Sequence, residues 1–403
     1  MTLGRLLRLG VALTVMVMVL VPPSSAARTD IPGGAVAFIG HSNGRPACIE
    51  TFDIVQQIPR TLLCGPVGEG EGHLARSLAF SPDGTKVAFS ESGARSGVYV
   101  IGADGKGVRR VAYLNRSEIP GEFNGHGGLS PQSWSADSNQ LVLDRLRYTE
   151  YDACTQAKPF RVRFTVVQLS PPKLIQIAAV PQTRPRTTLG DIQWAPTGDR
   201  LLYVVNTNRV DRSYGLTECD QTGSSLYTIG RDGRDRHLVL TGRAVIQNAA
   251  WSPDGTTIAY TACGSGCALY TIGIDGTGVK RLASLRGGDS LTWIESNNEI
   301  LLDQGDKVLV IAAASGRLRR IVTPFYFAPH SRCGADENLL AVSPDGVWLA
   351  AMSREDYVFY DCKDPVLAFV SLVPLDGSAP LLPIRVAPRH GERWLDAISV
   401  VLK

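Results

Sequence analysis

The segment from Gln247 to Ala283 constrains the fold most, because it has the pattern of one complete four-stranded sheet. Its sequence is QNAAWSPDGTTIAYTACGSGCALYTIGIDGTGVKRLA. Short apolar runs alternate with three turn signals, SPDG, CGSGC and IDGTG, and each supplies the Gly or Asp-Gly that a tight antiparallel turn needs. A single sheet of this size cannot bury both of its faces, so the pattern predicts that it stacks on further copies of itself.

Copies of this unit recur along the chain. The segment from Arg76 to Ala112 repeats both the Ser-Pro-Asp-Gly-Thr turn and the final Gly-x-Asp-Gly-x-Gly-Val-x-Arg, and weaker copies follow in register. Such self-similarity is typical of a β-propeller. Seven blades are predicted from the first strands, which are expected near Ala79, Trp134, Trp194, Trp251, Trp293, Val342 and Trp394. Six blades remain the alternative, in which the stretch from Leu291 is not a blade.

The two ends of the chain are predicted to complete one blade together. AVAFIG at Ala35 and the two runs after it supply a second, third and fourth strand, whereas RWLDAISVV at Arg393 supplies a first strand. Pairing these strands would close the ring and remove its open sheet edges. The sequence therefore predicts an all-β, seven-bladed propeller of four-stranded antiparallel blades over residues 28–403, with blade 1 shared by residues 34–65 and 391–403.

Residues 1–27 have the pattern of a signal peptide. Arg5 and Arg8 precede an apolar run that is too short to cross a bilayer, and small residues follow it. We expect an exported protein, secreted or held in the cell envelope, without stable membrane insertion after cleavage.

Loss of the two arginines of the signal peptide lowers the formal net charge from +3 to about +1, and basic residues look scattered along the sequence. This charge gives no reason to expect a nucleic-acid partner, and a monomer is expected.

The turn motif carries a family resemblance. With Ser-Pro-Asp-Gly at residues 81–84, 252–255 and 343–346, the chain resembles the WD-like propeller repeats of TolB and of the propeller domains of secreted peptidases. The resemblance implies the propeller fold. It implies little about function, because the motif is hairpin chemistry that any partner or substrate could accompany.

Propeller topology places the connections on two faces. The first-to-second and third-to-fourth turns of each blade are short and share the short-loop face, whereas the second-to-third loops and blade connections are long and share the long-loop face. Long loops on a rigid scaffold often carry binding residues. The leading hypothesis is a non-catalytic propeller that binds a protein, peptide or glycan there. The candidate contacts are aromatic and Arg side chains, namely Arg147, Tyr148, Tyr151, Arg212, Tyr214, Phe325, Tyr326 and Arg332.

All eight cysteines map to the long-loop face, and an exported chain favours disulfides. Proximity in the ring predicts four bonds, which are Cys48–Cys64, Cys154–Cys219, Cys263–Cys267 and Cys333–Cys362. Zinc binding by Cys263 and Cys267 is the alternative, although a matching second pair is missing.

An enzymatic alternative rests on histidines. Imidazoles from different blades could hold a divalent metal in the central channel. The candidate ligands are His73, His126, His330 and His390. Such an arrangement resembles that of seven-bladed oligogalacturonate lyases, which use a histidine-bound metal in the channel. No residue-by-residue motif supports that resemblance, so no cofactor is expected under the leading hypothesis. Gly40 to Gly44 fits G-x-S-x-G, but a strand rather than a helix follows it, which indicates a loop. A metal-dependent polysaccharide lyase or hydrolase is the competing function.

Overall fold

The structure is a computed structural model of the chain. It describes residues 32–41, 47–65, 73–92, 97–113, 128–146, 163–178, 187–211, 218–286, 290–294, 298–304, 307–323, 335–343, 345–355, 368–377, 380, 382–386 and 394–403. Within these ranges the regular secondary structure consists of strands. No helix in the described part of the chain is long and apolar enough to cross a membrane.

Seven antiparallel sheets of four strands form the molecule. Blades 1 to 4 consist of β28 (Trp394–Leu402), β1 (Gly34–His41), β2 (Cys48–Asp53) and β3 (Pro59–Cys64); β4 (His73–Phe80), β5 (Lys86–Ser92), β6 (Gly97–Gly102) and β7 (Arg109–Tyr113); β8 (Gly128–Trp134), β9 (Gln140–Leu146), β10 (Arg163–Leu169) and β11 (Pro172–Ala178); and β12 (Thr187–Trp194), β13 (Arg200–Asp211), β14 (Glu218–Gly230) and β15 (His237–Gly242). Blades 5 to 7 consist of β16 (Val245–Trp251), β17 (Thr257–Cys263), β18 (Cys267–Gly273) and β19 (Lys280–Leu285); β20 (Leu291–Ile294), β21 (Glu299–Asp303), β22 (Val308–Ala312) and β23 (Leu318–Val322); and β24 (Ala335–Val342), β25 (Trp348–Glu355), β26 (Ala368–Pro374) and β27 (Leu382–Val386).

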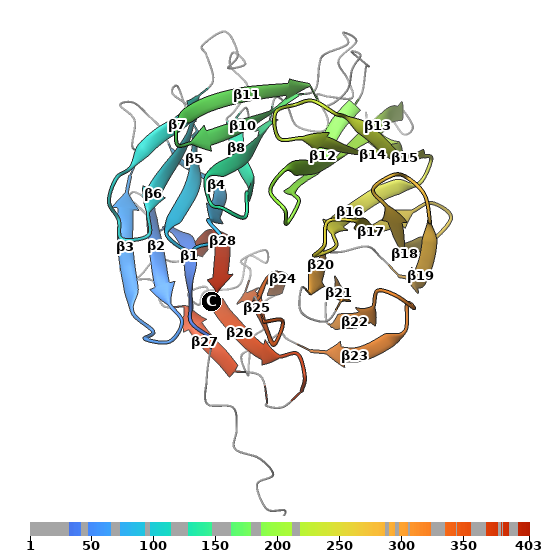
Figure 1. Cartoon of the computed structure of the whole chain (residues 1–403). Coiled ribbons are helices and arrows are strands. Elements are labelled where there is room, and N and C mark those ends of the chain that lie inside the picture. Colours follow the sequence, from blue (N-terminus) through green and yellow to red (C-terminus); the bar gives the residue numbers. More distant parts are fainter. Residues whose placement is uncertain are drawn as a thin grey trace, which may run out of the picture.

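The sheets stand around a ring, with one strand of each blade nearest the centre and one at the rim (Figure 1). The seven innermost strands contain the seven residues at which first strands are predicted. The stretch from Leu291 forms β20 and opens a full blade, so the seven-bladed prediction is confirmed and the six-bladed alternative is wrong.

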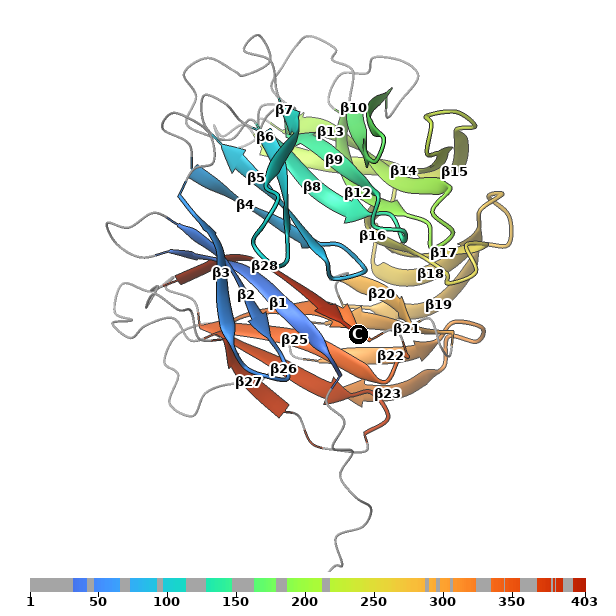
Figure 2. The same ribbon diagram turned by 60° about the vertical axis from the view of Figure 1, so that its left-hand side comes forward.

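The ring is closed as predicted, by pairing of β28 with β1. Their antiparallel register runs from Gly34 opposite Leu402 to His41 opposite Trp394, with one irregularity next to Phe38. Figures 1 and 2 both show β28 beside β1, at the inner side of blade 1. Closure gives blade 1 its fourth strand and removes a free sheet edge at the centre of the ring.

The core is divided among the seven contacts between neighbouring blades, which we call joints. Each joint contains one cluster of buried apolar side chains. Both faces of every blade are therefore covered, which explains the nearly continuous apolar runs of the middle strands. Joint 3/4, for example, packs Phe164 of blade 3 against Tyr203 of blade 4, with ring centroids 5.2 Å apart.

The repeated Ser-x-Asp turn is a closed set of hydrogen bonds. In blade 5 the Ser252 hydroxyl donates to Asp254 Oδ1 at 2.6 Å and accepts from the Thr257 amide at 2.9 Å, while the Thr256 amide donates to Asp254 Oδ1 at 3.0 Å. These bonds hold the pKa of Asp254 below its usual value. Blades 2, 3 and 7 repeat the serine–aspartate bond. The motif that identifies the repeat therefore serves the turn itself.

Candidate functional site

The predicted partner-binding residues lie outside the described part of the chain. This holds for Arg147, Tyr148, Tyr151, Arg212, Tyr214, Phe325, Tyr326 and Arg332, and also for His126, His330 and His390. His73 opens β4 opposite Ser92, but its side chain is not described. The described residues contain no cluster of three or more His, Cys, Asp or Glu side chains suited to a metal. The contact residues and the histidine site both stay predictions.

Two of the four predicted disulfides are confirmed. Cys48 and Cys64 bond across β2 and β3, and Cys263 and Cys267 bond across the β17–β18 hairpin, which excludes zinc binding by the second pair. Both disulfides lie at the long-loop ends of their strands and fix those ends covalently. Of the other four cysteines, Cys219 lies in β14 without a described side chain, and the other three lie outside the described residues, namely Cys154, Cys333 and Cys362.

Blade 4 has the longest strands of the described residues, with 12 residues in β13 and 13 in β14, and they extend toward the long-loop face. Pairing of β13 with β12 stops at Thr207, and pairing of β14 with β15 stops at Ser224. The β13–β14 pair continues past a register shift through four further pairs, from Asn208 opposite Gln221 to Asp211 opposite Glu218. We call residues 207–211 and 218–223 the ribbon. Among the described residues, β12 and β15 do not pair with this ribbon beyond Thr207 and Ser224, and Arg209, Asp220 and Thr222 are exposed along it.

Buried polar contacts fix the base of the ribbon to the ring. The Ser224 hydroxyl donates to Asn206 Oδ1 at 2.7 Å and accepts from the Ile246 amide of blade 5 at 2.9 Å. The Asn208 amide group donates to the Thr188 hydroxyl at 3.1 Å. Ser224 and Asn206 are buried, and hydrogen bonds between buried partners hold a position more firmly than exposed ones. The ribbon therefore rises from a rigid base.

A carboxylate on the innermost strand of blade 4 links two blades. Asp191 is largely buried, and burial raises its pKa while the hydrogen bond from the Ala249 amide, 3.4 Å from Oδ2, lowers it to a smaller extent. Gln193 Nε2 donates to the Ala249 carbonyl of the same neighbouring strand at 2.7 Å. Asp191 and Gln193 therefore both serve to bind β12 to β16 within joint 4/5.

The rim of the ring has a charge pattern that the sequence did not reveal. Every outermost strand carries a basic side chain and none contains Asp or Glu. The basic residues are Arg60, Arg109, Arg110, Lys173, His237, Lys280, Arg281, Arg319, Arg320 and Arg385. The outermost strands therefore share a charge character, although they hold only nine of the 41 Lys and Arg residues of the chain. Alignment of the fourth strands of the repeats, rather than a scan along the chain, is the signal that would have found the pattern.

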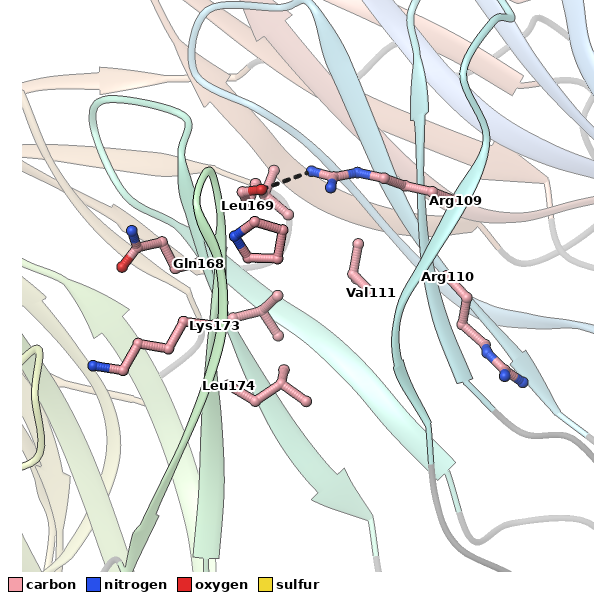
Figure 3. Close-up of a pocket in the computed structure, with 9 residues that line it drawn as sticks. Arg109, Arg110, Val111, Gln168, Leu169, Lys173 and Leu174 are labelled. Carbon is pink, nitrogen blue, oxygen red and sulfur yellow. Dashed lines mark hydrogen bonds between the residues drawn. The ribbon is translucent and has the colours of Figure 1, made fainter.

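A cavity of about 240 Å³ lies at the rim in joint 2/3, between β7 and the β10–β11 hairpin. Figure 3 shows Val111 and Leu174 pointing into the gap, while Lys173 points away from it. Arg109 reaches across the gap and donates from Nη2 to the Leu169 carbonyl at 3.3 Å. None of the nine lining residues is acidic. The cavity thus has a mixed lining of apolar and polar groups, with a guanidinium at its edge.

Comparison with known proteins finds similarity of fold. No protein-family model and no curated protein matches the sequence. A solved structure of prolyl endopeptidases is 14% identical with a TM-score of 0.55, and the match covers 91% of this chain and 50% of that one. TolB from Acinetobacter baumannii is 13% identical with a TM-score of 0.42, over 91% of this chain and 66% of that one. A nidogen/laminin complex is 11% identical with a TM-score of 0.40, over 72% and 94%. The chain thus spans half of the prolyl endopeptidase and just under two thirds of the TolB chain. At these identities the likeness is one of fold, and the chain is a seven-bladed β-propeller with TolB proteins among its structural neighbours.

Proposed function

We propose that the protein is an exported, non-catalytic propeller that binds a protein, peptide or glycan partner on its long-loop face. The ribbon of blade 4 is the observation that carries this proposal, since it extends past the last described pairs with β12 and β15 on that face and stands on a buried polar base. A binding surface benefits from such a base, because contact groups that are already held in place lose less entropy on binding.

The two disulfides support the same face and the same compartment. Cys48–Cys64 and Cys263–Cys267 close strand ends toward the long-loop face, and disulfides persist in oxidising environments outside the cytoplasm. The signal-peptide pattern of residues 1–27 agrees with export.

Site-specific photo-cross-linking tests this assignment. A photoreactive amino acid at Arg209, an exposed position of the ribbon, should cross-link a partner when the protein is produced in its native host and isolated from the culture fluid or envelope. The matched control carries the same amino acid at Arg317, an exposed position of the short β22–β23 turn on the opposite face and remote from joint 2/3. Adducts at position 209 that are absent at position 317 support the proposal. Equal labelling at both positions, or labelling at 317 alone, contradicts it.

The predicted aromatic contacts allow a second measurement on the cross-linked partner. Tyr151→Ala with Tyr214→Ala should weaken its binding by roughly tenfold or more, as expected when hot-spot aromatics are removed. Elemental analysis of protein purified without chelators separates the competing function. Stoichiometric divalent metal that is lost with His126→Ala would contradict the non-catalytic assignment and favour a metal-dependent lyase or hydrolase.

A further inference from the structure

We propose that the joint 2/3 cavity is a second binding site, which receives an acidic, glycine-bearing peptide turn of a partner protein. The cavity lies where Arg109 begins β7 and where β10 turns into β11, so it opens at the short-loop end of the rim. This is the opposite end of the blades from the ribbon. The inference therefore stands independently of the function proposed for the long-loop face.

In four other joints the same place is filled by the next blade's third-to-fourth turn, whereas the turn glycine of blade 7, Gly377, has no atom within 4 Å of its Cβ position. In joint 4/5, Gly276 packs so closely on β15 that a Cβ there would lie 2.8 Å from the Val239 carbonyl oxygen. Three more joints show the same approach of a turn glycine to the preceding outermost strand, with the pairs Gly105 and Leu62, Gly233 and Ile177, and Gly316 and Leu282. A polypeptide turn is thus the natural occupant of this groove.

Blade 3 lacks the turn that would fill joint 2/3. The Leu169 amide donates to the Asn139 carbonyl as the Ile274 amide donates to the Thr256 carbonyl, so the two turns start at equivalent residues. Two residues after these equivalent positions, blade 3 has Pro171 and blade 5 has Gly276, whose φ is +81°. Because the proline ring fixes φ near −65°, blade 3 cannot form that turn. It forms the tight β10–β11 hairpin instead, and the cavity remains beside β7.

The receiving side of the groove is unchanged in joint 2/3. A register shift makes Val111 the extra residue of β7, just as Val239 is the extra residue of β15. Val111 lines the cavity, whereas Val239 carries the carbonyl that Gly276 approaches. The surface that accepts a glycine turn is therefore present in joint 2/3, and only the turn is missing.

Charge selects an acidic turn. Arg109 uses one donor for the Leu169 carbonyl at 3.3 Å, whereas a guanidinium offers five, and a carboxylate can accept two of them side by side. The lining holds no carboxylate, and of its three cationic side chains Arg109 reaches across the gap while Arg110 and Lys173 point away from it (Figure 3). Three of the four turns that approach a preceding outermost strand contain aspartate next to glycine, as in Asp275-Gly276, and the fourth has Ser315 before Gly316. An Asp-Gly turn from a partner would match both the shape and the charge of the site.

A cyclic hexapeptide with the sequence of residues 273–278, Gly-Ile-Asp-Gly-Thr-Gly, is the probe. Its fluorescein conjugate should bind the full chain saturably, as measured by fluorescence anisotropy. Arg109→Ala should weaken binding roughly tenfold, the loss expected for a hydrogen-bonded charge pair. The matched control is Lys280→Ala, because Lys280 holds the same register position on β19 and donates to the Ala314 carbonyl of the next turn. Lys280→Ala should leave the affinity unchanged.

A peptide with asparagine in place of aspartate completes a double-mutant cycle. It should bind the native protein roughly tenfold more weakly and should lose nothing further with Arg109→Ala. Absence of saturable binding, equal losses with Arg109→Ala and Lys280→Ala, or additive losses in the cycle would each overturn the proposal. So would binding of heparin or of anionic phosphatidylglycerol vesicles with the same dependence on Arg109, because the site would then recognise polyanions in general.

Discussion

Joints 4/5 and 2/3 are built from the same repeat and differ in one turn. In joint 4/5 the Asp-Gly turn of blade 5 reaches the bulged residue Val239 of the preceding blade and closes the groove. In joint 2/3 the bulged residue Val111 is present, but Pro171 prevents the turn and a cavity of about 240 Å³ remains. The comparison teaches that local turn chemistry decides where this ring is closed and where a cavity remains.

Glycine substitution within one turn should produce the largest effect. Gly276→Ala introduces a Cβ 2.8 Å from the Val239 carbonyl and forces alanine to a φ of +81°. We expect it to lower the free energy of unfolding by about 3 kcal/mol, from left-handed strain and overpacking together. The matched variant Gly278→Ala has a φ of +68° and nothing within 4 Å, so only the strain of about 1 kcal/mol applies. Denaturant unfolding measures both, and equal losses would mean that Gly276 does not close the joint.

Truncation of the two bulged valines should produce an intermediate effect. Val239 is buried under the blade 5 turn, so Val239→Ala should cost about 2 kcal/mol for the lost methyl groups and the space they leave. Val111 already borders a cavity, and Val111→Ala should cost less than about 1 kcal/mol. Thermal unfolding of the two variants makes the comparison. A larger loss at Val111 would show that joint 2/3 is as tightly packed as joint 4/5.

The aspartate of the closed joint should add a small, pH-dependent effect. The Thr277 amide and hydroxyl both donate to Asp275, and these bonds hold its pKa below the usual value. A lowered pKa in the folded state stabilises the fold above the unfolded pKa near 4, and this gain disappears as the pH falls through the folded pKa. Asp275→Asn should thus lower Tm by roughly 1 °C at pH 7 and leave it unchanged near pH 2.

Blade 3 supplies the control for this pH effect. Its equivalent residue, Ser170, does not titrate, so Ser170→Ala should shift Tm equally at both pH values. Differential scanning calorimetry at several pH values distinguishes the two variants. An Asp275→Asn difference that persists near pH 2 would show that the side chain acts through packing rather than through its charge.

The sequence was sufficient for the ring but not for its joints. Turn motifs and apolar runs predicted all seven first strands, the closure of β1 by β28 and the bonds Cys48–Cys64 and Cys263–Cys267, because hairpins and neighbouring strands are local or repeated features. The basic rim and the joint 2/3 cavity were missed. Both depend on which residues of different blades become neighbours, and that register is set by bulges such as the one at Val111. The long-loop contacts, Tyr151 among them, lie outside the described residues and stay predictions.

Replacing the blade 3 turn by that of blade 5 tests the central claim most directly. The exchange is equal in length, with Ser-Pro-Pro-Lys at residues 170–173 replaced by Asp-Gly-Thr-Gly. If Pro171 keeps joint 2/3 open, the grafted turn should fill the groove beside Val111, raise Tm by about 2 °C or more, and abolish binding of the cyclic hexapeptide. A folded variant with unchanged or lowered Tm that still binds the peptide with native affinity would contradict the account.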